Sequence, residues 1–117
     1  MSSQSNQANN ATHQIHQLIR KAIDHKRLIR LRYGGKERIA EPHDYGVISG
    51  IPRLFCYQIG GESKNPLPNW RLLDVAKISE LEVLDRSFAG SRGSSYRKHL
   101  VWDEVFARVG PPEKPAS

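Results

Sequence analysis

Arginine and aromatic side chains recur through the middle of this sequence in a way that suits phosphate binding. An arginine guanidinium is planar, so it can donate hydrogen bonds to two oxygens at once and can also stack on a base. Exposed aromatic rings offer stacking platforms for single-stranded nucleic acid. Residues of both kinds fall on adjacent predicted strands: Arg38, Arg53 and Arg71, with Tyr45, Phe55, Tyr57 and Trp70.

The aromatic residues have a second interpretation, as core. Large aromatic side chains are usually buried, and for Phe55, within "RLFCYQ", this reading is favoured. Tyr45 lies beside a turn and is the better candidate for an exposed ring.

Positive charge is concentrated near the start of the chain. The formal net charge is +6, and residues 20–38 hold eight basic and two acidic side chains, enough to account for all of it. Such a field attracts phosphate. The alternative is that these side chains form a solvated helix and strand face. The charge cluster alone does not distinguish that face from an anion-binding surface.

Motifs for catalysis, metals or cofactors are weak. His13 and His16 have a spacing that could suit two metal ligands, but no third ligand accompanies them. His43-Asp44 has no accompanying nucleophile, and Cys56 lies in an apolar run typical of an inert thiol. We therefore expect a non-enzymatic protein without catalytic residues, metal or cofactor.

The elements that must position these residues follow from hydrophobic periodicity. An i, i+3, i+4, i+7, i+8 stripe predicts an amphipathic helix, with Thr12 as its N-cap. The alternating "LIRLRY", Gly34-Gly35 and "KERIAEP" predict a hairpin, whose second strand Pro42 ends or bends. A second hairpin is predicted to turn near Gly50.

Two more strands are predicted at "WRLLDVAKI" and "ELEVLDRSF", giving about five short strands, the pattern of a small barrel. "SYRKHLVWDEVFARV" predicts a second helix that ends at Gly110. The predicted organisation is a disordered tail (1–11), a barrel domain with its leading helix (12–88), a linker and C-terminal helix (89–110), and a tail (111–117).

Composition is consistent with one small domain. The chain has 117 residues, 38% of them hydrophobic, and a single cysteine, which rules out an internal disulfide. Neither a secretion signal nor an apolar stretch long enough for a membrane span is recognisable. We expect a cytoplasmic protein.

The order of these patterns resembles the WYL domain family. The resemblance covers roughly residues 14–88 and rests on "AIDHKRLIRLRYGGKERIAEPHDYG", "GIPRLFCYQ" and "WRLLDVAKISELEVLDRSF". It implies an SH3- or Sm-like barrel that senses or binds nucleic acid or nucleotide-like ligands, often in a regulatory role. Arg38, Arg71 and Lys77 then match basic positions of the family, and Arg53 lies where its Trp-Tyr-Leu triplet begins.

The chain also departs from that family. "RLF" (53–55) replaces the Trp-Tyr-Leu triplet, Asp74 stands where another arginine is expected, and only one helix fits before residue 28. The resemblance thus implies a stand-alone, divergent member.

Together these patterns predict a ligand-binding domain for a phosphate-bearing ligand, either short single-stranded nucleic acid or a nucleotide. The predicted ligand-binding residues are Arg38, Tyr45, Arg53, Tyr57, Arg71 and Lys77. The alternative is a protein–protein interaction or homodimerisation module that uses the barrel and the C-terminal helix.

Overall fold

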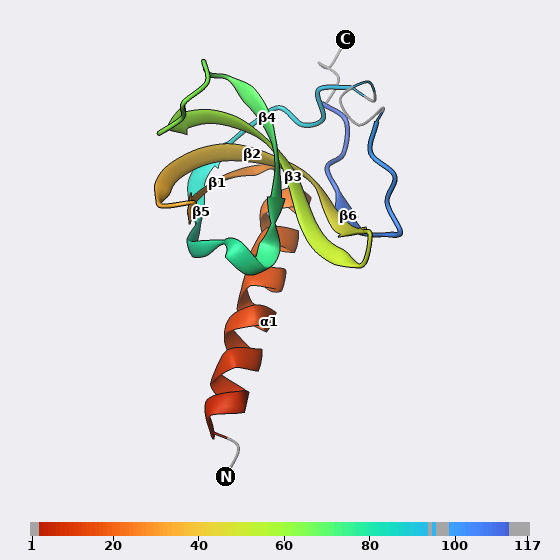
Figure 1. Ribbon diagram of the computed structural model, residues 1–117. Coiled ribbons are helices and arrows are strands. Elements are labelled where there is room, and N and C mark those ends of the chain that lie inside the picture. Colours follow the sequence, from red (N-terminus) through yellow and green to blue (C-terminus); the bar gives the residue numbers. More distant parts are fainter. Residues whose placement is uncertain (1–2, 94, 96–98, 113–117) are drawn as a thin grey trace.

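A computed structural model describes residues 3–93, 95 and 99–112, with side chains from His13 onward. The elements are α1 (Ser3–Asp24), β1 (Arg27–Tyr33), β2 (Lys36–Ile48), β3 (Ile51–Gly61), β4 (Asn69–Asp74), the 3-10 turn η1 (Val75–Lys77), β5 (Ser79–Ser87) and β6 (Glu104–Arg108). The six strands form one antiparallel sheet in the order β4-β3-β2-β1-β5, and β6 pairs with β2. The predicted mainly-β class is confirmed. The sheet curves strongly, but no pairing joins β4 to β5 among the described residues, so it is not closed (Figure 1).

Helix α1 carries the predicted apolar stripe onto the sheet. Ile19, Ala22 and Ile23 are fully buried in a core that they share with Ile29 and Leu54. The helix begins at Ser3, however, well before Thr12, and its first turns project from the globular part (Figure 1). Residues 3–11, predicted as a tail, therefore continue the helix, and this stretch contains no proline or glycine to interrupt it. No helix in the described part of the chain has the length and apolar character that a membrane span requires.

Both predicted hairpin turns are confirmed. Gly34 and Gly35 have φ of 61° and 75°, and the next turn places Ser49 and Gly50 at 51° and 76°. Two consecutive residues with positive φ are typical of the tight turns whose twist matches that of the flanking strands.

Strand β2 is longer than the sequence predicted, because Pro42 bends the strand without ending it. Pro42 lies opposite Cys56, and the β2–β3 register shifts between Pro42 and Asp44. A bulge here lets β2 continue to Ile48, so that its second half can pair with β3 on one side and β6 on the other.

The predicted C-terminal helix is wrong for the described residues 99–110. Residues 104–108 instead form β6, whose Ala107 lies opposite Tyr45 of β2. Arg108 is ion-paired to the buried Asp44 at 2.9 Å, and the backbone N–H of Val109 donates to the carbonyl of His43 at 2.8 Å. Long-range pairing and burial thus override the local helical spacing, as they commonly do for short apolar segments.

Candidate anion-binding site

Two arginines from separate strands converge on one buried amide. The Nη1 of Arg38 on β2 donates to Gln58 Oε1 at 2.9 Å, and the Nε of Arg71 on β4 donates to the same oxygen at 3.2 Å. Gln58 lies on β3 between them and is fully buried. Its Nε2 donates to the carbonyls of Gly60 and Glu62, both at 3.0 Å, which fixes the orientation of the amide.

Further contacts hold the two guanidinium groups in place. Arg71 Nη2 donates to Ser63 Oγ at 2.5 Å, in the loop that links β3 to β4. Arg38 Nε donates to the carbonyl of Tyr33 at 3.4 Å, and its guanidinium carbon lies 5.9 Å from the centre of the Tyr33 ring. These bonds leave Arg38 Nη2 and Arg71 Nη1 without a hydrogen-bond partner among the described residues.

Neither arginine forms an ion pair within the described part of the chain. Burial lowers the pKa of Arg38, and the nearby charge of Arg71 lowers it further. Both effects disfavour the charged form of Arg38. An anion placed between the two groups would reverse the second effect, because it attracts both.

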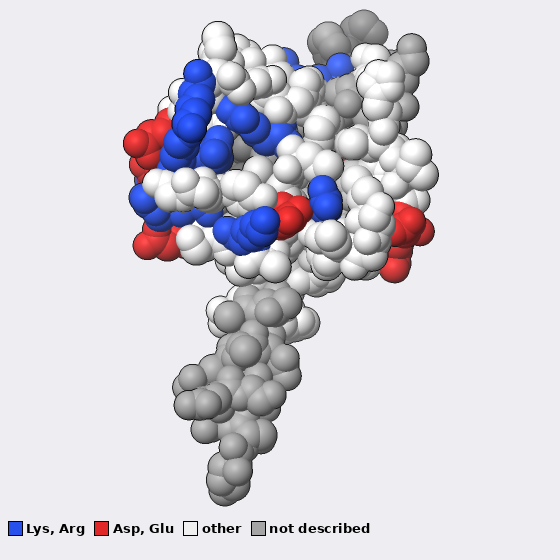
Figure 2. Space-filling view, in the orientation of Figure 1, with Lys and Arg blue, Asp and Glu red and all other residues white. Residues whose placement is uncertain are grey.

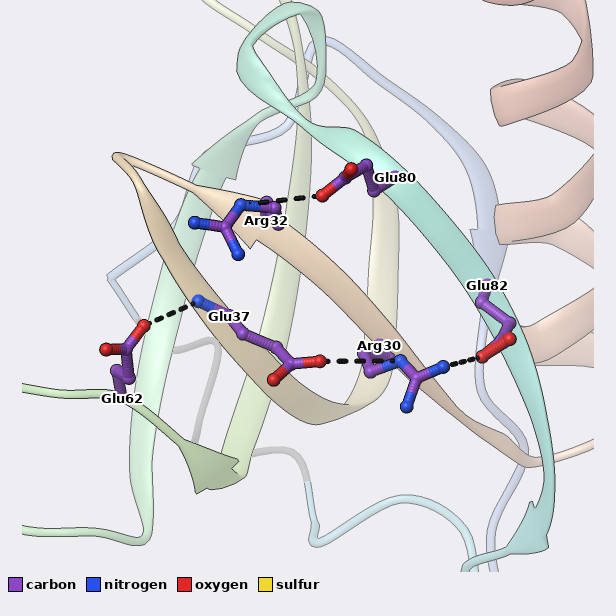
Figure 3. A network of polar contacts seen from close by, with 6 residues as sticks. All are labelled: Arg30, Arg32, Glu37, Glu62, Glu80 and Glu82. Atoms are coloured by element: carbon purple, nitrogen blue, oxygen red, sulfur yellow. Dashed lines mark hydrogen bonds and ion pairs between the residues drawn. The ribbon is translucent and has the colours of Figure 1, made fainter.

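The arginines of β1 differ, since acidic side chains neutralise them. Arg30 contacts both Glu37 and Glu82, and Arg32 lies 3.4 Å from Glu80 (Figure 3). Arg27 is paired in the same way with Asp85 at 2.5 Å. Three of the eight basic residues between 20 and 38 are therefore ion-paired on the β1 surface, which fits the solvated strand face that the sequence left open for this part of the run.

The surface view agrees with a local basic region. Lys and Arg side chains gather on one side of the globular part, around the end of the sheet that holds the β1–β2 turn and the β3–β4 loop, with acidic side chains at the margin (Figure 2).

The other predicted basic residues lie elsewhere. Arg53 and Lys77 both contact Asp74, at 3.4 and 3.5 Å. In the β3–β4 ladder Arg53 lies opposite Asp74, whereas Arg71 lies opposite the core residue Cys56. Because neighbouring residues of a strand point to opposite faces, Arg53 lies on the outer face of the sheet and Arg71 on the inner face. The structure thus brings Arg38 and Arg71 together but separates them from Arg53 and Lys77.

Tyr45 is not the exposed ring that the sequence suggested. It is 3% exposed, and its hydroxyl lies 2.7 Å from Nδ1 of His16. It faces the core because it lies opposite the buried Leu54, so a stacking role for Tyr45 is excluded in this conformation.

The other three aromatic residues that the sequence singled out, Phe55, Tyr57 and Trp70, form a layer on the outer face. The rings of Phe55 and Trp70 are stacked at 5.0 Å, and the Tyr57 ring lies 4.6 Å from Trp70. Phe55 is buried, as its alternative reading predicted, and the guanidinium of Arg92 covers Tyr57 at 4.1 Å. These three rings lie on the face opposite to Arg38 and Arg71, so they do not stack beside the pair; the ring next to Arg38 is that of Tyr33, whose hydroxyl accepts from the backbone N–H of Asp74 at 3.1 Å.

Sequence reasoning missed Gln58, Ser63 and Arg92. Gln58 shares a strand face with Leu54 and Cys56, so its only signal is a polar residue on an otherwise apolar face. Cys56 itself is an unreactive thiol: burial raises its pKa to about 12, although the charges of Arg38 and Arg71 oppose this.

Comparisons with known proteins add no identification: no family model, no curated protein and no solved structure matches this chain.

Proposed function

We propose that this chain is a non-enzymatic ligand-binding domain with a regulatory role, and that it binds a phosphate-bearing ligand through Arg38 and Arg71. The ligand is a nucleotide or the backbone of a short single-stranded nucleic acid. One observation carries the proposal: two guanidinium groups converge on the neutral Gln58 amide and have no carboxylate partner among the described residues.

The chemistry of this pair fits phosphate well. Each guanidinium keeps an uncommitted nitrogen, and charge-assisted hydrogen bonds from arginine to phosphate are about twice as strong as neutral ones. Phosphate contact is better supported than base stacking, because the outer aromatic layer lies on the other face of the sheet.

The proposal includes the finer fold assignment as well. We propose that the curved sheet is a small SH3- or Sm-like barrel and that the chain is a divergent WYL-like protein. The strand order β4-β3-β2-β1-β5 and the leading helix support this, together with the sequence resemblance. A cytoplasmic setting belongs to the same proposal, since reduced thiols such as Cys56 are usual there.

A protein-interaction or homodimerisation module is the second candidate. Val101 is 80% exposed, Val105 40% and Ile51 39%, so apolar side chains reach the surface near β6 and the β2–β3 turn. Under this alternative the interaction element is β6, in place of the helix expected from the sequence. Light scattering over a range of protein concentrations tests it, and Val105→Lys should then shift the protein toward monomer.

Fluorescence anisotropy with labelled oligothymidylate and with a labelled nucleotide, at several salt concentrations, tests the phosphate proposal. We expect Arg38→Gln and Arg71→Gln each to weaken binding to different sequences about equally. Each should also reduce the slope of log affinity against log salt by roughly 0.7, the share of one single-strand phosphate contact.

Arg86→Gln is the matched control, because it removes the same charge from an exposed position on β5. It should leave both affinity and slope nearly unchanged. If wild type binds neither probe at low salt, the phosphate proposal fails. If Arg86→Gln weakens binding as much as the other two variants, the ligand is attracted by the overall positive charge of the protein, and the proposed site is wrong.

A further inference from the structure

A cavity lies between helix α1 and the sheet, away from the arginine pair. Its volume is about 650 Å³, within the range of roughly 300–1,000 Å³ that small-molecule sites occupy. Most of its wall is apolar and comes from Ile15, Pro52, Val75, Ala76 and Phe106. None of the residues that hold the arginine pair takes part in it.

The polar groups of the cavity are few and converge. Tyr45 and His16 line it, and the 2.7 Å contact between the Tyr45 hydroxyl and His16 Nδ1 holds both rings in place. Edge contacts of His16 with Tyr45 and Phe106, at 5.2 and 5.5 Å, fix the imidazole further. An apolar chamber with a small, oriented polar cluster is the usual form of a site for a small amphipathic molecule.

The charged groups around the cavity favour a negatively charged ligand. Its polar wall consists of His13, His16 and Tyr45, and no Asp or Glu side chain lines it among the described residues. Arg20, one turn further along α1, is close enough for its charge to lower the pKa of both His16 and Tyr45. Burial is the larger cause for each shift, lowering the pKa of His16 and raising that of Tyr45. A positive field over an apolar chamber favours an anion that carries a hydrocarbon or aromatic body.

We propose that this cavity binds a small carboxylate with an apolar body, such as a medium-chain fatty acid or an aromatic acid. The body packs against Ile15, Val75 and Phe106, and the carboxylate is attracted by the positive charge of Arg20. This site is independent of the proposed phosphate site, so either can fail alone.

Nuclear magnetic resonance titration with three probes of the same chain length tests the proposal. Decanoate, 1-decanol and decyltrimethylammonium share the apolar body and differ in the charge of the head. We expect decanoate to bind at least about fivefold more tightly than decanol, and the cation to bind most weakly. Amide shifts should be largest for residues 13–20, 75–76 and 106.

Two variants distinguish the contribution of the ligand's apolar body to binding from that of its charged head group. Ala76→Trp adds an indole at an exposed position in the cavity wall and should abolish binding of decanoate and decanol alike. Arg20→Gln should lower decanoate affinity toward that of decanol and leave decanol unchanged, whereas Arg86→Gln should change neither.

The proposal is overturned if decyltrimethylammonium binds as tightly as decanoate, if no probe binds, or if Ala76→Trp, shown to be folded, binds decanoate as well as wild type. If that variant does not fold, Arg20→Gln decides: equal loss for decanoate and decanol, or no loss for either, also overturns it.

Discussion

The guanidinium of Arg92 holds the carboxylate of Glu41 with two hydrogen bonds, of 2.8 and 2.9 Å. Glu41 is 6% exposed on β2, and Arg92 reaches it from the segment that follows β5. The bond to Glu41 is the main cause of the raised pKa of Arg92. Together with Arg108 and Asp44, it fastens the C-terminal segment to β2 through two buried carboxylates.

Arg92→Ala should therefore destabilise the fold. It leaves the Glu41 carboxylate buried without its partner, which we expect to lower the free energy of unfolding by about 1–3 kcal/mol. The lower part of that range is favoured because the Arg92 side chain is 45% exposed, so water screens the pair. Urea unfolding measures the change. In a Glu41→Gln background the same substitution should cost less, and an equal loss in both backgrounds would show that the ion pair is not the cause.

Gly46→Ala should displace β6 from the sheet. A Cβ at Gly46 would lie 2.1 Å from the backbone oxygen of Glu104 and 3.0 Å from the Trp102 ring, so one strand must move. We expect a loss of about 1–3 kcal/mol in the free energy of unfolding, with amide shift changes in residues 102–109. Gly60→Ala is the control, because its Cβ would meet Ile39 at an ordinary 3.5 Å. Similar losses in the two variants would contradict this account.

Local patterns predicted the parts of the fold that local physics decides. The helix stripe through Ile19 and Ile23, and the Gly34-Gly35 turn, each depend on a few neighbouring residues. The C-terminal strand β6, by contrast, does not depend on neighbouring residues alone. The residues around Val105 fit a helical spacing and an alternating one, and the outcome depends on a vacant edge of β2 beside Gly46, some 60 residues away in sequence.

The candidate site could be predicted in residue type but not in arrangement. Arg38 and Arg71 could be named as candidates from the sequence, because the planar guanidinium of arginine matches the geometry of phosphate. Their common partner Gln58 has only a weak signal, its place on the same strand face as the apolar Leu54 and Cys56, and this does not indicate which side chains it would contact. The separation of Arg53 and Tyr57 from the pair depends on strand register, and a register shift of one residue exchanges the faces.

The first β-hairpin can be tested through its backbone alone. No atom lies within 4 Å of a Cβ added at Gly35, so only its φ of 75° opposes a side chain. Gly35→Val should cost about 1–2 kcal/mol, whereas Gly35→Asn should cost clearly less because asparagine tolerates this conformation. Thermal unfolding compares them, and equal melting temperatures for both variants and wild type would argue against this turn.

The Cys56 thiol should not react in the native state. With a pKa raised to about 12 and a fully buried side chain, almost none of it is thiolate at pH 8. A colorimetric disulfide reagent should therefore label Cys56 only as fast as the protein unfolds, and labelling should become complete in denaturant. Rapid labelling of the folded protein would show that the inner face near Arg38 and Arg71 is open to solvent.

Stability should fall as the pH drops through the histidine range. Burial lowers the pKa of His43 below its usual 6.5, outweighing the bond to the Glu41 carbonyl, and the pKa of His16 is lowered as well. Below pH 6.5 the unfolded chain therefore binds protons that the native protein does not, and this favours unfolding. The stabilising contribution is complete above about pH 7 and is lost toward pH 5, by at most about 1.4 kcal/mol per pH unit for each histidine. Urea unfolding at pH 7.5, 6.5 and 5.5 measures the slope. His43→Gln should flatten it more than His25→Gln, an exposed control just after α1. Identical slopes in these variants and wild type would show that the pKa of His43 is the same in the folded and unfolded chain.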